Sequence, residues 1–168
     1  MGPGRLMMMI HKSLKECDNI LRIFHDKQPN IRAKYHREVE HHVRHARLLT
    51  APNGRKRDFF GRITDSVLNE GISFIPQATV SDQLKFSLYE TFKECETYVR
   101  PLAEAHDGFL SEVKEGREVE YARVFKKNVE TPIDFSRCSL SRDFKLVIPM
   151  ESEYSKESWQ DLKKLDLN

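Results

Sequence analysis

The helical spacing of apolar residues near the N-terminus is the feature that most constrains the fold. These residues recur three and four positions apart, with mostly charged residues between them: Met7, Ile10, Leu14, Cys17, Leu21 and Phe24. Such spacing is typical of an amphipathic helix with one buried face. Pro29 disfavours helical geometry at the residue before it, so the sequence predicts one helix that ends near residues 25–28.

Two further helices are predicted before residue 72. Asn30 is expected to cap a second helix, whose apolar residues recur at helical spacing as far as Leu49. The turn residues at 50–54 then stop it. Asp58 is expected to cap a short third helix that stops at Gly71.

The strongest long helix is predicted to follow a connector over residues 72–78. It begins at Thr79, and its buried stripe is expected to contain Val80, Leu84, Leu88, Phe92, Cys95 and Val99. Pro101 is expected to kink it or to divide it from another helix that ends at Gly116.

The pattern changes after Gly116. Val119, Tyr121 and Phe125 look partly alternating, and residues 144–148 form a compact apolar run, so short strands or an extended arm are predicted. In the tail, Trp159, Leu162 and Leu165 lie three residues apart, which favours a short terminal helix. A leucine-rich nuclear export signal or a kinase-docking peptide would give a similar pattern.

These elements predict a mainly α fold, because short connections join amphipathic helices into antiparallel neighbours. We expect an antiparallel bundle of four to five helices, with a short β or extended segment in the C-terminal third. The length favours a single domain over 1–168. It would be helical over 5–115, mixed or extended over 116–150, and would end in a short helix over 155–166.

Charge is divided unevenly along the chain. The net charge is +2, but residues 1–62 carry +8 and six of the seven histidines, whereas residues 63–168 carry −6. This asymmetry indicates a surface for an acidic partner, unless the two halves neutralise each other.

The basic, histidine-rich segment is the predicted binding face. Its candidate residues are Arg32, Arg37, His41, Arg44, His45, Arg55, Lys56 and Arg57. Glu38, His41 and His45 are weak candidates for a metal site, because histidines four apart share one helix face. A solvated helix face explains them equally well, and we expect no metal and no cofactor. If the histidines crowd together, acidification would charge a face that is already basic.

The three cysteines are widely spaced and odd in number, which favours a reducing compartment. Cys17 and Cys95 lie on apolar stripes, so Cys138 is expected to be the exposed thiol. The sequence has neither a signal peptide nor a membrane span. Cytoplasm or nucleus is therefore the expected location.

No recognised catalytic motif is present, which favours a non-enzymatic role. The leading hypothesis is a protein interaction module, either an adaptor, a regulator or an assembly subunit, whose partner is a protein with an acidic surface. A second hypothesis is that segment 32–62 binds RNA or single-stranded nucleic acid, because cations contact phosphates and aromatic rings stack on bases. A third is an enzyme, metal-dependent or otherwise. The partner's identity and the oligomeric state stay open.

Overall fold

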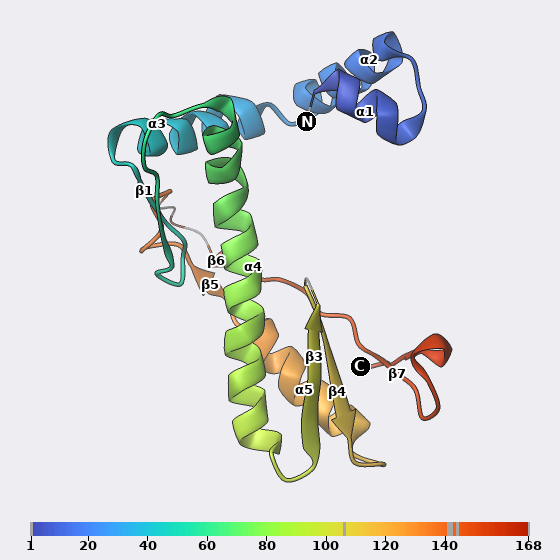
Figure 1. The fold of residues 1–168 in the computed structure, drawn as a ribbon. Helices are drawn as coiled ribbons and strands as arrows, with labels where there is room; N and C mark the ends of the chain where they lie inside the picture. The colour runs from blue at the N-terminus through green and yellow to red at the C-terminus, as the bar shows by residue number, and fades with distance from the viewer. Residues whose placement is uncertain (1, 106, 141–142, 144, 168) are drawn as a thin grey trace. The chain divides into compact units, whose positions relative to one another are not determined.

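The computed structural model describes residues 2–105, 107–140, 143 and 145–167. About 53% of the chain is helical, with small antiparallel strand pairs between the helices (Figure 1). The mainly α prediction is therefore confirmed, whereas a bundle is not. The chain divides into two compact units, Met1–Leu48 with Asp58–Ile72 (unit 1) and Leu49–Arg57 with Ser73–Asn168 (unit 2). That these units form one domain stays a prediction.

Unit 1 begins with two helices, α1 (Pro3–Ile10) and α2 (Leu14–Lys27), where one was predicted. His11 adopts a left-handed conformation with φ of 54°, which ends α1. The Ser13 hydroxyl then accepts a hydrogen bond from the Glu16 N–H at 3.3 Å, and the Glu16 carboxylate accepts one from the Ser13 N–H at 2.9 Å. This capping box starts a new helix within the apolar stripe. The predicted end before Pro29 is confirmed.

The next helical segment consists of a π-helical turn (Ile31–His36) and α3 (Arg37–His45). Asn30 already has helical backbone angles and its side chain makes no capping hydrogen bond, so the predicted cap is wrong. Leu49 lies in a strand, because β1 (Leu48–Thr50) pairs with β2 (Lys56–Asp58). The predicted turn is confirmed, since the Gly54 N–H donates to the Ala51 carbonyl at 2.9 Å.

A single helix, α4 (Asp65–Cys95), replaces the predicted third helix, connector and fourth helix. Asp58 lies in β2 and caps nothing; the Thr64 hydroxyl accepts from the Val67 N–H at 3.4 Å instead. Pro76 lacks an N–H and so leaves the Ile72 carbonyl without its helical donor. The Tyr35 hydroxyl donates to that carbonyl at 2.5 Å. This bond compensates for the proline and lets the helix continue where the sequence predicted a connector.

The buried face of α4 in unit 2 contains part of the predicted apolar stripe together with polar side chains. Leu84, Cys95 and, just after the helix, Val99 are buried as predicted, and Leu88 packs on the core. The buried residues of this face are Ile75, Ala78, Thr79, Gln83, Leu84, Ser87, Thr91 and Cys95. Phe86, Tyr89 and Phe92 are exposed. Buried hydroxyls are satisfied within the helix, since Thr79 donates to the Ile75 carbonyl at 2.7 Å and Ser87 to the Gln83 carbonyl at 2.6 Å. The buried face therefore combines apolar side chains with hydroxyls that already have hydrogen-bond acceptors.

Two antiparallel strands, β3 (Val99–Ala105) and β4 (Gly108–Val113), replace the helix predicted after Pro101. Ala105 pairs with Gly108, and Asp107 lies in the turn between them. The pairing register shifts between Pro101 and Ala103, and such irregularities accommodate a proline in a strand. Gly108 is already the first residue of β4, and Pro101 marks the strand before the turn as one that cannot continue α4.

Helix α5 (Glu118–Val129) replaces the predicted alternating strands. Its buried residues, Ala122, Phe125 and Val129, are spaced by three and four positions, which is helical spacing. Phe125 and Val129 pack with Leu84 of α4 to form a hydrophobic core, and Leu88, Phe109 and Met150 pack against it.

The C-terminal part of unit 2 is built from short strand pairs. β5 (Ile133–Asp134) pairs with β6 (Lys145–Leu146), so the run predicted at 144–148 is partly a strand; Phe144 lies outside the described residues. β7 (Glu153–Tyr154) pairs with β8 (Lys163–Lys164) around a short 3-10 turn (Trp159–Asp161), which replaces the predicted terminal helix. Within the described residues, no helix is long and apolar enough to cross a membrane.

Candidate functional site

Helix α3 carries part of the predicted binding face. The ring centroids of His41 and His45 are 4.5 Å apart, and both residues are exposed. Arg44 is exposed too, but its Nε lies 2.8 Å from the Glu40 Oε1 in an ion pair. Arg37 lies one helical turn before His41 and is exposed. The helix therefore brings these four residues together, with part of their charge neutralised.

The weak metal candidates do not converge. Among the residues that the structure describes, no three His, Cys, Asp or Glu side chains are grouped to hold a metal ion. Glu38, His41 and His45 share a helix face, but that face supplies a histidine pair and not a complete ligand set.

Arg32 lines a separate cleft in unit 1. The cleft has a volume of about 430 Å³ and is also lined by His36, Glu40 and Asp65. Partial burial, reinforced by the positive charge of Arg32, lowers the pKa of His36 below its usual value. His36 therefore resists protonation and does not add charge to the basic face as readily as a solvated histidine.

The other three predicted residues lie in unit 2, on the β1–β2 hairpin. The Arg55 guanidinium donates to both carboxylate oxygens of Asp82 on α4, with Nε to Oδ2 at 3.1 Å. Lys56 and Arg57 are exposed on β2. The eight predicted residues are thus divided: four lie together on α3, Arg32 lines its own cleft, and three lie on the β1–β2 hairpin. Arg55 has a structural role, because it fixes that hairpin to α4.

The turn between β3 and β4 is the feature that the sequence interpretation missed. Asp107 is exposed there and makes no ion pair with any described residue. Two residues later, Phe109 packs on the core with its ring centroid 6.0 Å from that of Phe125. A solvent-facing carboxylate is therefore held on a hairpin anchored in the core.

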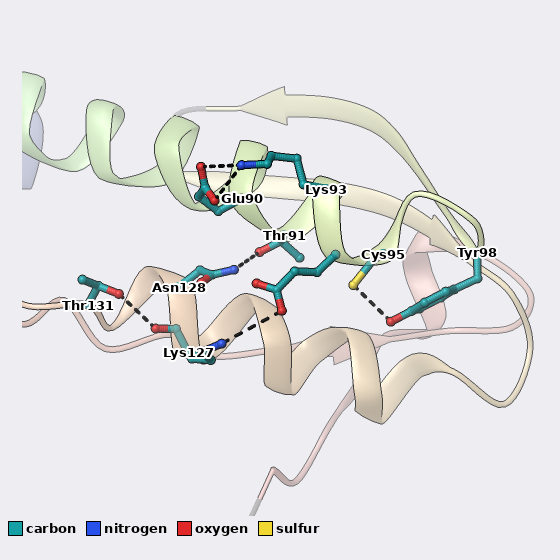
Figure 2. Close-up of polar contacts among 9 residues, drawn as sticks. Glu90, Thr91, Lys93, Cys95, Tyr98, Lys127, Asn128 and Thr131 are labelled. Carbon is teal, nitrogen blue, oxygen red and sulfur yellow. Dashed lines mark hydrogen bonds and ion pairs between the residues drawn. The ribbon is translucent and has the colours of Figure 1, made fainter.

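Helices α4 and α5, which support this hairpin, are joined by polar contacts (Figure 2). The Asn128 amide donates to the Thr91 hydroxyl at 3.0 Å. The Gln83 amide donates to the carbonyls of Asn128, Val129 and Thr131 at the C-terminal end of α5, with the bond to Val129 at 2.9 Å. These bonds satisfy carbonyls that have no partner within their own helix.

The beginning of β3 is held in the same way (Figure 2). The Tyr98 hydroxyl donates to the Cys95 sulfur at 3.0 Å, and the Arg117 guanidinium lies over the Tyr98 ring at 4.3 Å from its centroid. Burial, together with the hydrogen bond to Cys95, raises the pKa of Tyr98 to about 12. Tyr98 therefore stays a neutral donor at ordinary pH.

Cys138 is not the exposed thiol that the sequence predicted. It is only 5% exposed, and its sulfur accepts from the Leu140 N–H at 3.4 Å. The predicted burial of Cys17 and Cys95 is confirmed. The loop around Cys138 packs on β1, where the Thr50 N–H donates to the Ser139 hydroxyl at 2.8 Å and so draws the cysteine inward.

Comparison with known proteins gives a fold neighbour and no family. No protein-family model and no curated protein matches this chain. Among solved structures, the chain is similar to the POL domain of Pol1 from M. smegmatis, solved in complex with a DNA primer-template and dNTP. The TM-score is 0.67 at 17% sequence identity. The likeness covers 79% of this chain and 25% of that chain, so this chain spans about a quarter of its neighbour's length.

This likeness corrects the leading functional hypothesis. The sequence favoured a non-enzymatic interaction module because no catalytic motif was recognised. The fold, however, is one that a polymerase domain contains, so the adaptor prediction is wrong. A missing local motif is a weak reason to exclude catalysis, because catalytic residues can converge from distant parts of a chain.

Proposed function

We propose that this chain is part of a nucleic-acid polymerase domain and that it binds a DNA primer-template. The observation that carries the proposal is the fold similarity over 79% of the chain to a polymerase domain solved with DNA and dNTP. The similarity extends across most of the chain, which a helix hairpin or a single strand pair shared by chance would not produce.

The exposed cations of β2 support this proposal. Lys56 and Arg57 follow each other on an exposed strand, and Arg55 fixes that strand to α4 through Asp82. Cations on a rigid element bind DNA phosphates at little entropic cost, and each phosphate contact releases condensed counterions. The hairpin is thus suited to hold the phosphate backbone without reading its sequence.

Neutralising both cations is expected to weaken DNA binding. For the double variant Lys56→Gln, Arg57→Gln, the slope of log affinity against log salt should fall by about 2, because each lost phosphate contact removes about one unit. Fluorescence anisotropy of a labelled primer-template measures the affinity and its slope against salt. Salt concentrations of roughly 50–200 mM cover the range over which such binding changes strongly.

The matched control is Lys93→Gln with Arg100→Gln, which removes the same charge from exposed ion pairs elsewhere in unit 2. This control should lose less affinity than the β2 double variant. The proposal would be refuted if DNA binding by the wild type did not depend on salt. If the two double variants lost the same affinity for DNA, the β1–β2 hairpin would not be part of the DNA-binding surface.

Asp107 is the carboxylate of this chain best suited to a divalent cation. Mg²⁺ prefers oxygen ligands and commonly takes one or two carboxylates, with phosphates and water completing its shell. Asp107 is exposed and unpaired on an anchored turn, and the described residues supply no group of three ligands. It therefore fits as one ligand of an ion that substrate phosphates also bind. The ion would supply charge neutralisation at those phosphates.

The variant Asp107→Asn is expected to change how DNA binding responds to Mg²⁺. In EDTA the variant should bind DNA about twofold more tightly, because one negative charge near the phosphates is gone. With Mg²⁺ added, wild-type affinity should rise more than that of the variant. Anisotropy titrations with and without Mg²⁺ measure the difference.

Glu96→Gln is the control for that experiment, since Glu96 is an exposed carboxylate in the same unit. It should leave the response to Mg²⁺ unchanged. If wild type and Asp107→Asn respond alike, Asp107 is not the cation ligand, whereas the binding proposal for Lys56 and Arg57 is unaffected.

A further inference from the structure

Unit 2 contains a large cavity that the proposed function uses only at Asp107. Its volume is about 1020 Å³, and it is lined by parts of α4, β4 and α5 and by residues 148–165. Ligand pockets for drug-sized molecules have volumes of roughly 300–1,000 Å³, so this cavity can accept several side chains at once. Asp107 lies at its lining on the hairpin, and Glu153, Glu157 and Trp159 line it on the C-terminal segment.

The charge of this lining is strongly negative. Seven carboxylates line the cavity, against one ammonium group, that of Lys156. Three of the carboxylates are in ion pairs: Glu112 with Arg100 at 2.8 Å, Glu115 with Lys156 at 2.5 Å and Glu151 with Lys164 at 3.2 Å. The other four, which include Glu153 and Glu157, have no ion-pair partner among the described residues. Such a cavity repels phosphate and attracts a cation.

The lining is also aromatic. Phe109, Tyr121 and Phe125 form the wall on the hairpin and α5, and Tyr154 and Trp159 belong to the C-terminal segment. Trp159 is 65% exposed, and Leu162 in the same lining is exposed as well. The exposed Trp159 ring and the partly exposed rings beside it, with carboxylates near them, suit a ligand that alternates cationic and apolar groups, because cations also bind over ring faces.

We propose that this cavity binds a basic, amphipathic peptide segment of a partner protein. Lysine or arginine side chains of the segment pair with Glu153 and Glu157, and its apolar side chains cover Trp159 and the aromatic wall. The carboxylates of the C-terminal segment disfavour a phosphate backbone beside them, whereas the ion proposed at Asp107 would lie on the β3–β4 hairpin. The site is distinct from the cations of β2 that carry the proposed DNA binding.

Trp159 is the only tryptophan of the chain and serves as the reporter. The probe is a synthetic 12-residue peptide that alternates lysine and leucine, a length of roughly 40 Å when extended. Titration into the full chain should change Trp159 fluorescence saturably and less strongly as salt increases. A peptide with glutamate in place of lysine should leave the fluorescence unchanged.

The double variant Glu153→Gln, Glu157→Gln is expected to weaken peptide binding by about threefold to tenfold, since exposed charge pairs contribute little individually. The control, Glu94→Gln with Glu96→Gln, removes one carboxylate from α4 and one from the turn after it. Neither residue lines the cavity, so this variant should bind the peptide as wild type does. DNA anisotropy of the Glu153, Glu157 variant should stay at the wild-type value, which separates this site from the DNA surface.

Three results would overturn the proposal. One is an unchanged Trp159 signal with the lysine–leucine peptide, and another is an equal response to its glutamate counterpart. The third is full competition by spermine at the peptide's own concentration, which would show that the cavity recognises charge alone and no peptide.

Discussion

Replacing Phe125 by alanine is expected to lower the free energy of unfolding of unit 2 by about 3–5 kcal/mol. Phe125 is 9% exposed and packs with Leu84 and Val129, and its ring stacks on that of Tyr121 with centroids 6.1 Å apart. Removing the ring loses buried apolar surface and leaves a cavity. The two helices and the β3–β4 hairpin around it can fill that cavity only in part. Trp159 lies in the same unit, so urea titration of its fluorescence measures the change.

Phe86→Ala is the matched control for this prediction. Phe86 lies on α4 in the same unit but is 54% exposed, so its truncation should cost less than about 1 kcal/mol. Equal destabilisation by the two variants would show that the hydrophobic core is not where the structure places it.

Replacing Gln83 by methionine is expected to lower the free energy of unfolding of unit 2 by about 1–3 kcal/mol. The side chain is 6% exposed and donates to three carbonyls at the C-terminal end of α5. Methionine has a similar size but no donor, so the Val129 carbonyl loses its side-chain partner while buried and the other two carbonyls lose theirs at partly buried positions. We expect faster hydrogen exchange at the last amides of α5 as well as a lower urea midpoint.

Gln77→Met controls for the change in side-chain type, because Gln77 is exposed on α4 in the same unit. It should change stability by no more than about 0.5 kcal/mol. If Gln83→Met proves neutral, water or a rearranged side chain satisfies the α5 carbonyls, and the amide does not hold the two helices together.

The sequence pattern predicted the presence of helices better than their ends. The helix end before Pro29 and the turn at 50–54 were predicted because proline and turn residues act locally. The helix predicted to run as far as that turn, however, ends at His45. Another local signal, the Ser13 capping box, was present but was outweighed by apolar spacing that continued across it.

Other features depend on contacts between residues that are distant in sequence. The connector over residues 72–78 became helical because the Tyr35 hydroxyl satisfies the carbonyl that Pro76 leaves without a donor. The loop around Cys138 is buried because Ser139 bonds to β1. In both cases the two hydrogen-bonded residues are more than 30 positions apart in the sequence, so a local pattern does not show the contact.

The candidate site likewise has features that the sequence predicted and features that depend on distant contacts. The basic residues were identified from composition, but their grouping was not, because Arg55 pairs with Asp82 far along the chain. Asp107 was not singled out, since one carboxylate in a sequence of 26 acidic residues carries no signal by itself. Its position on an anchored turn makes it a candidate.

The sequence by itself determined a mainly helical chain, its uneven charge, and the turns set by proline and glycine, because these follow from local sterics and from composition. Only the tertiary structure decided that the buried face of α4 also includes polar side chains, at positions 79, 83, 87 and 91, beside the predicted Leu84 and Cys95. These side chains can be buried because they bond to carbonyls and to Asn128, and a helical period does not show such partners. The structure also placed Asp107 on a hairpin, because strand pairing joins residues whose spacing alone would suit a helix.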